Sequence, residues 1–548
     1  MIKTKLFFYQ FFIAVLIFLG AVSSFGQTTW NVPGDGSNTC TIGNPSCDTI
    51  QEAIDAAISG DTVNVAAGNY PENINLDKRL TLGGVQSGVD ACGRIANESV
   101  ITGAGTLLNL VTGSAGSIIN GFTFSGGVTQ INSSSGPIDD LQILNNRFVD
   151  FTGSGVFLND SGEDITVNQN LIDGTSQGGG GGIFHLDQDN FDGFHFTNNC
   201  VSDGATGFFV DGNRQVGSSA NRSPLFSGNL FERNGAGINA GRMGIENAAF
   251  SGNIFQDNDF DGLQGGPSNS MISTNIFSGN GRYGLRLTGF GGGGDPDRGA
   301  QDNTVFNNCF LGNGFTNAGA GIIFDAGQFP GTISTNTLNF NNISGNAVGA
   351  TYGGAEPIDS ERNWWGAPDG PSGDGPGGGD AVDGITIDFD PFLTLIAENT
   401  PCSPQPTILL GPPTGTNLLF TDHTVTATVL IDGAPAPGLL VTFEIISGQN
   451  AGTMSIPNSA ECSQNDDCTT DANGQVSWTY TSNRPGTDTI VASFTVPNSV
   501  TVESEPVEKI WERTPIVTPT LSEWGLIAMA GVLGIIGLLA IQRRKITV

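Results

Sequence analysis

Length, composition and charge restrict the classes of protein that this sequence can encode. The chain has 548 residues, of which 81 are Gly, and it carries 53 acidic against 20 basic side chains for a formal net charge of -33. A surface this acidic repels nucleic-acid phosphates and anionic lipid headgroups, so divalent cations, neutral glycans and proteins are the expected partners. Because a single compact core does not extend over a chain of this length, we expect several units or a repeat array.

The N-terminus has the three parts of a secretion signal. A basic start in residues 1–5 precedes an apolar run in residues 6–19 and the small-x-small site Ser24-Phe25-Gly26. We therefore predict a signal peptide over residues 1–26 and export of the chain from Gln27 onward. An N-terminal anchor helix is the alternative, but the apolar run is short for a membrane span of about 20 residues.

A loose unit recurs between residues 27 and 397, in which alternating apolar residues lead to an Asn, further apolar residues and a turn. Five equivalent Asn residues lie at steps of 29, 30, 24 and 22 residues, namely Asn170, Asn199, Asn229, Asn253 and Asn275. Variable spacing near one coil's length is typical of a β-solenoid, whose insertions go into loops while the strands stack. We expect each Asn to take the left-handed conformation at a bend and the amides to bond along the axis as a ladder.

Both ends of this region carry their own patterns. Residues 47–58 have apolar positions at helical spacing, which predicts a helix over the first coil, and residues 68–74 begin the strands. At the far end stand Asn363-Trp364-Trp365-Gly366 and residues 387–393, and the tryptophans are expected to cover the last coil, with a sugar-stacking platform as the alternative. These segments and the repeat resemble the secreted right-handed parallel β-helix proteins of the pectin-lyase-like kind. The resemblance implies the fold and leaves the activity open.

The composition changes after Pro401 to alternating strands that are separated by turn signals such as Asn473-Gly474. Short strands at regular spacing predict a β-sandwich over residues 398–510. Residues 435–443 and 470–476 resemble bacterial immunoglobulin-like domains of the intimin and invasin type, which implies a spacer. The predicted fold class is thus all-β, with a right-handed parallel β-helix, an immunoglobulin-like β-sandwich and a C-terminal transmembrane helix.

The C-terminus combines a short motif, an apolar helix and a basic end. Linker and motif occupy residues 511–525, the predicted transmembrane helix residues 526–542 and the basic tail residues 543–548. The motif residues are Pro519, Thr520, Leu521, Trp524 and Gly525. They resemble the IPTL-type C-terminal sorting signal of Gram-negative bacteria, although Thr518 stands where the family has Ile. The resemblance implies an exosortase-like membrane protease as partner and delivery to the envelope or outer surface; a simple tail anchor is the alternative.

The chain contains eight cysteines, and export makes disulfides the expected state of at least some of them. Two close pairs bracket short loops and are the predicted disulfides, Cys40 with Cys47 and Cys462 with Cys468. Cys200 and Cys309 follow Asn-Asn pairs at the same place in their repeats, about four coils or roughly 19 Å apart, so they cannot bond to each other. We predict core thiols there, and the sequence leaves the pairing of Cys92 and Cys402 open.

Two clusters could carry metal or acid-base chemistry. Asp257, Asp259 and Asp261 have the alternating spacing of a calcium loop, with Gly262 following, but Ser268 stands where such a loop would end in Glu. Calcium is therefore the one candidate cofactor, and an ordinary acidic turn is the alternative. The second cluster is the densest meeting of His and carboxylate residues and comprises His185, Asp187, Asp189, Asp192 and His195. Charged loop residues between two strands explain it without chemistry.

The sequence favours binding over catalysis. Many right-handed β-helix proteins degrade polysaccharides, but the repeats have few Arg or Lys residues and no paired acid-base motif of such enzymes. We therefore predict no catalytic or cofactor-binding residues. The predicted function is that of an adhesin-like structural or binding protein, which displays a β-helix on an immunoglobulin-like stalk. Its ligand is a glycan or a protein that the sequence does not identify. The alternative function is a polysaccharide lyase or hydrolase of the pectin-lyase-like fold.

Overall fold

In the computed structural model the described residues are 27–33, 40–95, 97–133, 135–159, 161–178, 181–187, 191–210, 221–288, 299–325, 333, 335–403, 406–431, 434–455, 462, 467–495, 501–515 and 522–544. The predicted signal peptide lies outside them, as do motif residues Pro519, Thr520 and Leu521. The chain divides into two compact units, residues 1–403 and 404–548. Each unit has its own hydrophobic core.

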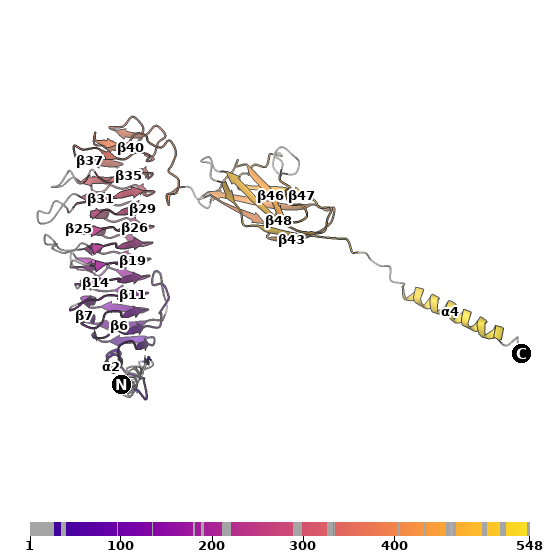
Figure 1. Ribbon diagram of the computed structural model, residues 1–548, viewed down its shortest axis with the longest axis horizontal. Coiled ribbons are helices and arrows are strands. Elements are labelled where there is room, and N and C mark those ends of the chain that lie inside the picture. The colour runs from indigo at the N-terminus through magenta and orange to yellow at the C-terminus, as the bar shows by residue number, and fades with distance from the viewer. Residues whose placement is uncertain are drawn as a thin grey trace, which may run out of the picture. The chain divides into compact units, whose positions relative to one another are not determined.

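The first unit is a stack of coils, and most coils add one strand to each of three parallel sheets (Figure 1). The β1–β41 sheet contains β1 (Thr29–Val32), β2 (Thr62–Val65), β5 (Thr81–Gly83), β8 (Ile118–Asn120), β11 (Gln142–Leu144), β15 (Thr166–Asn168), β19 (His195–Thr197), β23 (Leu225–Ser227), β26 (Ala249–Ser251), β29 (Met271–Ser273), β32 (Thr304–Phe306), β35 (Thr337–Asn339), β38 (Ile358–Asp359) and β41 (Ile387–Asp388). The β3–β36 sheet contains β3 (Gly68–Pro71), β6 (Ser99–Gly103), β9 (Phe122–Gly126), β12 (Arg147–Val149), β16 (Leu171–Asp173), β20 (Cys200–Ser202), β24 (Leu230–Glu232), β27 (Ile254–Gln256), β30 (Ile276–Ser278), β33 (Cys309–Leu311) and β36 (Asn342–Ser344).

The third sheet, the β4–β39 sheet, has the longest strands and completes each coil. It contains β4 (Ile74–Leu76), β7 (Thr106–Leu110), β10 (Thr129–Ser133), β13 (Ser154–Leu158), β17 (Gly182–Leu186), β21 (Thr206–Val210), β25 (Ala236–Glu246), β28 (Asp261–Ser268), β31 (Tyr283–Thr288), β34 (Ala320–Asp325), β37 (Ala350–Tyr352), β40 (Gly379–Asp383) and β39 (Pro371–Gly373). The short strand β22 (Asn221–Arg222) pairs with β25, and β14 (Gly162–Glu163) pairs with β18 (Phe191–Asp192). The predicted β-helix is confirmed.

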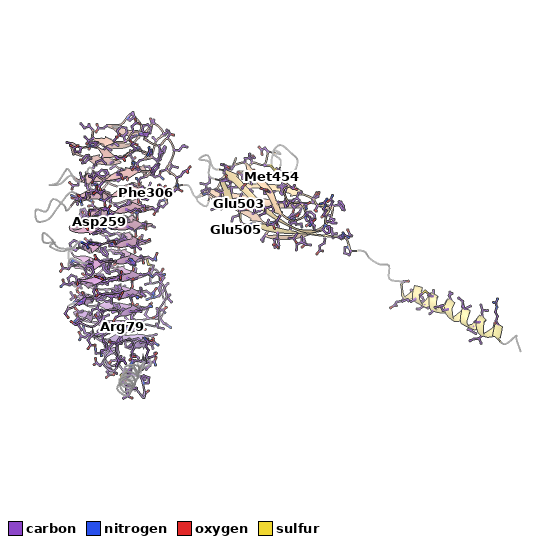
Figure 2. The ribbon with its side chains drawn as sticks, viewed as in Figure 1. Arg79, Asp259, Phe306, Met454, Glu503 and Glu505 are labelled. Atoms are coloured by element: carbon purple, nitrogen blue, oxygen red, sulfur yellow. A yellow bond between two sulfur atoms is a disulfide. The ribbon has the colours of Figure 1, made fainter. Side chains whose placement is uncertain are left out.

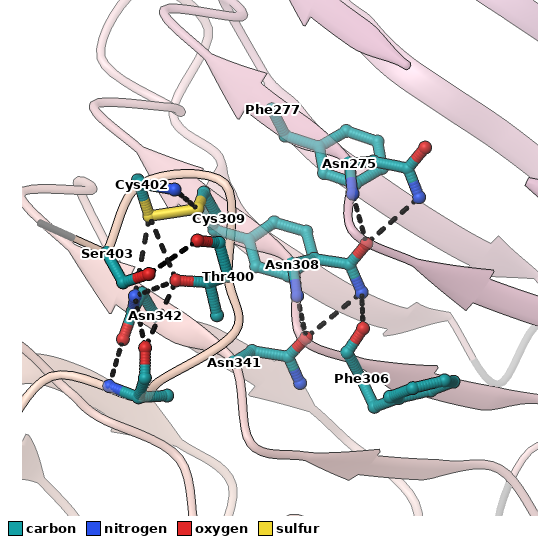
Figure 3. The surroundings of a disulfide bond; sticks show 12 residues. Asn275, Phe277, Phe306, Asn308, Cys309, Asn341, Asn342, Thr400, Cys402 and Ser403 are labelled. Carbon is teal, nitrogen blue, oxygen red and sulfur yellow. Dashed lines mark hydrogen bonds between the residues drawn. A yellow bond between two sulfur atoms is a disulfide. The ribbon is translucent and has the colours of Figure 1, made fainter. Parts of the chain in front are cut away.

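The predicted Asn ladder is also confirmed, and it is longer than expected. At each step the backbone N–H and side-chain amide of one Asn donate to Oδ1 of the next, and Asn170, for example, bonds Asn199 at 2.9 Å through both groups. The ladder runs through Asn146, Asn170, Asn199, Asn229, Asn253, Asn275, Asn308, Asn341 and Asn363. Figure 3 shows its segment from Asn275 through Asn308 to Asn341.

The backbone at this bend differs from the expectation in one respect. The left-handed conformation belongs to the residue before each ladder Asn, as at Gln169 (φ 57°), Asn198 (φ 54°) and Gly228 (φ 68°). The ladder Asn itself does not have positive φ, because its side chain must point inward along the axis to reach the next coil. The predicted left-handed conformation of the Asn residues is therefore wrong by one position, whereas their bonding role is right.

A second ladder, which the sequence analysis missed, lies five residues later in each coil, at the bend between the β3–β36 and β4–β39 sheets. It runs through Asn234, Asn258, Asn280, Asn313 and Asn346 and ends on the carboxylate of Asp380. Asp380 accepts from the backbone N–H of both Gly345 and Asn346 as well as from the Asn346 amide. Burial nevertheless raises the pKa of its carboxyl group above the ordinary value.

Between the ladders, phenylalanines stack coil upon coil inside the β3–β36 sheet. Phe231, Phe255, Phe277 and Phe310 follow one another with ring centroids 5.2, 4.9 and 4.8 Å apart and nearly parallel planes. Glycines of the β4–β39 sheet pack against them, and a Cβ on Gly262 would lie 3.0 Å from Phe255 Cβ. A glycine at such a position, like Gly262, thus leaves space for the phenylalanine that packs against it.

Both ends of the β-helix are covered as the sequence predicts. Helix α2 (Ile50–Ala56) begins at the N-cap Thr49, buries Ile50, Ala53 and Ile54, and contacts β1, β2 and β4. At the other end Trp365 is 0% exposed within the core, so this ring covers the last coil and is not available as a sugar platform. The covering segments close off apolar coil ends that would otherwise expose strand edges and core.

The second unit contains two packed sheets and, at its end, a helix. One sheet consists of β42 (Pro406–Gly411), β44 (His423–Ile431), β45 (Ala434–Pro435) and β47 (Gln475–Tyr480). The other consists of β43 (Thr414–Leu418), β50 (Val507–Glu512), β48 (Gly486–Thr495), β46 (Val441–Ser447) and β49 (Thr501–Glu503). Their inner faces share a core that includes Phe443, Trp478 and Trp511. Helix α4 (Glu523–Arg544) is long and apolar enough to cross a membrane.

Candidate functional site

Three outer faces of the β-helix are available to a ligand, and two of them are poor candidates. The β3–β36 face is covered at both ends by strap segments, which we define as the N-terminal strap (residues 86–95) and the C-terminal strap (residues 397–403). In the N-terminal strap, Arg94 donates to Asn145 O at 2.8 Å and is paired with Glu98 at 2.9 Å. The β1–β41 face bears an uneven set of side chains, in which Thr166, Ala249 and Ser251 stand among the isolated larger side chains of His195, Leu225 and Met271, so it offers no continuous aromatic or hydrogen-bonding row.

The straps are held by two disulfides that correct the prediction for Cys200 and Cys309. Cys92 bonds Cys200, and Cys402 bonds Cys309, with Cα–Cα distances of 5.8 and 6.0 Å. Figure 3 shows the second disulfide beside the Asn ladder. The prediction of core thiols is wrong because Val201 and Phe310 take the inward positions of their strands, so the cysteines beside them face the straps. Consequently the β-helix unit extends to residue 403, beyond the boundary at 397 predicted from composition.

The two predicted short-range disulfides, Cys40–Cys47 and Cys462–Cys468, are confirmed. No cysteine is left free. Four disulfides in one chain are typical of an exported protein.

The β4–β39 face carries the most distinctive side chains, in a line that we call the outer row. Its members are register partners on successive strands and point away from the core: Asn75, Asn109, Asn132, Phe157, His185, Phe209, Asn239, Gln264, Arg286, Ile323 and Thr351. Successive strands of a sheet lie about 4.8 Å apart, so the row presents one side chain per coil at that interval. Amides occupy its first part and aromatic rings its middle, and the side chains beyond are polar except for Ile323.

The middle of the outer row is an aromatic segment. The ring of His185 lies between those of Phe157 and Phe209, with centroid distances of 4.7 and 5.0 Å. All three side chains are half-buried, so each presents part of its ring to solvent. The amide of Asn132 borders this segment and donates to Asn109 Oδ1 at 3.2 Å. Three rings in a line with amides beside them form an elongated surface that is partly apolar and partly hydrogen-bonding.

The predicted His and carboxylate cluster is separated by the coil geometry. His185 faces outward from the β4–β39 sheet, whereas His195 is exposed on the β1–β41 sheet. Asp192 accepts from the backbone N–H of Arg222 at 3.2 Å. Asp189 lies outside the described residues. His185 therefore belongs to the outer row, and His185, Asp192 and His195 do not form one site.

The calcium hypothesis for Asp257, Asp259 and Asp261 is corrected by the structure. Asp257 takes the left-handed position before ladder residue Asn258 (φ 52°), and Asp259 is exposed (Figure 2). Asp261 is 0% exposed and pairs with Arg282, whose Nε lies 2.8 Å from Oδ1. Over the described part of the chain, no group of three or more His, Cys, Asp or Glu side chains is placed to hold a metal ion. The alternating spacing reflects the coil bend and this ion pair.

Two arginines give the far part of the β4–β39 face its charge pattern. Arg282 is paired with Asp261 and lies over the rings of Phe260 and Tyr283, at 5.6 and 5.4 Å from their centroids. The hydrogen bond to Asp261 raises the pKa of the Arg282 guanidinium, which therefore stays charged. Arg286, within the outer row, donates from Nε to Asp325 Oδ2 at 3.1 Å. Both guanidinium groups are thus fixed in orientation.

Comparison with known proteins agrees with this description of the fold. Residues 181–364 match the family model described as a right-handed beta helix region, so the first unit is a right-handed parallel β-helix. Residues 518–544 match the IPTL-CTERM motif. With the apolar helix α4 and the disulfides, this motif marks the chain as exported and membrane-anchored.

Solved structures with some similarity include three proteins. The pectate lyase Pel9A is 14% identical with a TM-score of 0.40, covering 58% of this chain and 80% of its own. The periplasmic alginate epimerase AlgG is 11% identical with a TM-score of 0.31, covering 60% of this chain and 76% of its own. The catalytic domain of a GH87 α-1,3-glucanase is 12% identical with a TM-score of 0.30, covering 55% of this chain and 67% of its own. No curated protein matches the sequence.

Proposed function

We propose that this protein is displayed in the cell envelope and binds a neutral glycan chain along the outer row. The observation that carries the proposal is the aromatic segment of Phe157, His185 and Phe209 beside Asn132. Aromatic rings pack on the apolar C–H faces of sugars, and amides bond the hydroxyl groups. The interval of about 4.8 Å between coils is close to the length of one pyranose residue in an extended chain. A net charge of -33 favours a neutral glycan over an acidic polymer.

Removing both phenylalanine rings is expected to abolish most of the affinity. In Phe157→Ala/Phe209→Ala, each lost ring should weaken binding about tenfold, because buried aromatic anchors carry a large share of binding energy. Binding is measured on a glycan array and then by calorimetry with the best neutral oligosaccharide. Met271→Ala is the matched control, since Met271 is an apolar side chain that is 50% exposed on the β1–β41 face. Equal affinity of the double variant and the wild type would reject the outer row as the binding site.

A polysaccharide lyase or hydrolase is the second candidate function. The favouring observation is the Arg286–Asp325 pair, which places a basic and an acidic group at the outer row. Either reaction needs an acid-base pair beside the bound glycan. We expect the protein to release no new reducing or unsaturated ends from pectin, alginate or neutral glycans. Turnover that is lost in Arg286→Ala would replace the binding proposal by an enzymatic one.

The second unit and the tail fit surface display. The two-sheet unit is proposed to be an immunoglobulin-like spacer, and the motif around Trp524 and Gly525 to be read by an exosortase-like protease. Trp524 lies at the start of α4, so the motif adjoins the end of the apolar helix.

Two processing events are expected in cells, one after Gly26 and one near Pro519. The apolar residues 6–19 and the motif before α4 are the reasons for the two positions. Pulse-chase labelling with membrane fractionation and N- and C-terminal sequencing measures both. A mature protein that keeps residues 526–542 in the inner membrane would leave only a tail anchor.

A further inference from the structure

A buried lysine lies in the two-sheet unit without a carboxylate partner. Lys509 on β50 is 0% exposed, and its Nζ donates to Asn417 Oδ1 at 2.5 Å. The ammonium group lies 5.0 Å from the ring centroid of Trp511. Among the described residues, no Asp or Glu forms an ion pair with Lys509, and burial alone lowers the pKa of its amine. A buried charge without an ion-pair partner is costly.

The nearest acidic residue by register is already saturated with hydrogen bonds. Asp488 faces Lys509 across the β48–β50 pair and is 0% exposed. Its Oδ2 accepts from Trp511 Nε1 at 3.0 Å and from Asn450 Nδ2 at 2.6 Å, and its Oδ1 accepts from Asn450 N at 3.1 Å. These donors hold the carboxylate within its own network. Lys509 is thus left with the Asn417 side-chain amide as its hydrogen-bonding partner.

The sheet geometry brings three reactive groups together over one glycine. Strands β43 and β50 are parallel, with Gly415 opposite Lys509 and Asn417 opposite Trp511. A Cβ on Gly415 would lie 3.4 Å from Lys509 Nζ and 3.0 and 3.6 Å from Cε1 and Nε2 of His423. Because Gly415 has no side chain, there is space above it for the Lys509 amine to reach Asn417. The imidazole of His423 lies beside the same space.

We propose that Lys509 and Asn417 become joined by an intramolecular isopeptide bond, with His423 as the proton relay. The neutral amine of Lys509 attacks Cγ of Asn417, and a new C–N bond forms. One amine proton passes by way of His423 to the departing NH₂ group, the old C–N bond breaks, and ammonia leaves. The product is a secondary amide, so the reaction needs no oxidant, reductant or co-reactant.

The chemistry of the pocket suits each step. Burial lowers the pKa of the Lys509 amine, which increases the fraction in the neutral, nucleophilic form. Burial and the nearby lysine lower the pKa of His423 to about 4, so the imidazole is neutral at pH 7 and its free ring nitrogen can pass a proton on without retaining it. The amide product carries no charge and thereby removes the cost of a buried ammonium group.

The bond would tie together two strands that are distant in sequence. Asn417 and Lys509 are separated by 92 residues, which is most of the two-sheet unit. A covalent link between β43 and β50 restricts the unfolded chain in the way that a long-range disulfide does. Unlike a disulfide, it survives reducing agents.

Mass spectrometry of the intact chain tests the proposal. The full protein is purified in detergent, unfolded and reduced, so that the disulfides do not contribute to the mass. We expect the wild type to be lighter by one molecule of ammonia than Lys509→Arg, once the calculated mass difference between lysine and arginine has been subtracted. Tryptic peptides should include a branched species that joins the segments around Asn417 and Lys509. Lys509→Arg should lack the branched peptide, and Asn417→Asp should form the same bond with loss of one water.

Controls separate this bond from other events. Asn473-Gly474 can lose ammonia by forming a succinimide, so the loss must map to Asn417, and Asn473→Gln must retain it. His423→Ala should form the bond more slowly in a time course after synthesis, while circular dichroism reports whether the variant folds. A folded wild-type chain without an ammonia loss relative to Lys509→Arg, or an ammonia loss that maps to Asn473 or to another Asn-Gly sequence and not to Asn417, would overturn the proposal.

Discussion

Asn253→Ala is expected to lower the free energy of unfolding of the β-helix by about 4 kcal/mol, because several buried polar groups lose their partners at once. The Asn253 amide donates to Asn275 Oδ1 and Phe226 O, both at 2.9 Å. Its Oδ1 accepts from Asn229 Nδ2 at 2.8 Å and from Asn229 N at 3.1 Å. Alanine supplies none of these bonds, and the side chain that it replaces is 0% exposed.

Chemical denaturation followed by far-UV circular dichroism measures this loss. Asn64→Ala is the control, because Asn64 is exposed on β2 and stands outside both ladders. It should change the free energy of unfolding by less than about 0.5 kcal/mol. If both variants lost the same small amount, the ladder would contribute little to stability.

Removal of the N-terminal strap disulfide should have a similarly large effect. The Cys92–Cys200 bond closes a loop of 108 residues, so Cys92→Ser/Cys200→Ser should lower the free energy of unfolding by about 5 kcal/mol on the chain-entropy estimate. Cys40→Ser/Cys47→Ser opens a loop of only 7 residues and should cost about 2 kcal/mol.

Both double variants are compared with the wild type under oxidising conditions, and the wild type is also measured after reduction. Each variant removes one disulfide, so the informative result is which of the two variants loses more free energy of unfolding. A larger loss for the short loop would mean that strap contacts, such as Arg94 with Asn145, hold the strap without help from the disulfide.

The β-helix could be predicted because its determinants repeat. Asn170, Asn199 and Asn229 recur with the strands around them, so the ladder is visible in the sequence alone. The second ladder was equally visible, since Asn234, Asn258 and their equivalents each follow a ladder residue by five positions. The position of the left-handed bend residue was harder to predict, because it depends on which way the Asn side chain must point.

Long-range pairings could not be predicted in the same way. Cys92 and Cys402 lie in straps, and the repeat spacing does not determine where a strap crosses the coils. Asp261 looked like a calcium ligand because its partner, Arg282, lies 21 residues away, directly before the next strand of the sheet, β31. Recognising the pair requires the register of β28 and β31, which sequence spacing alone does not provide.

The lysine pocket had a weak signal in the sequence. Val507, Lys509 and Trp511 alternate with charged or exposed residues, and this pattern places Lys509 on the buried side of β50. The predicted β-sandwich ends at residue 510 and so leaves out Trp511. Without Trp511, the alternation that places Lys509 on the buried side of the strand is not apparent. The proximity of Asn417 depends on the parallel pairing of β43 with β50.

A crystal structure of the β-helix with a bound neutral oligosaccharide tests the proposed function most directly. The oligosaccharide is the one that binds most tightly on the array. We predict that its sugar rings lie along the outer row, in contact with Phe157 and Phe209, and that its chain axis runs across the strands of the β4–β39 sheet. An oligosaccharide bound on the β1–β41 face or on the two-sheet unit, with the outer row empty, would contradict the account.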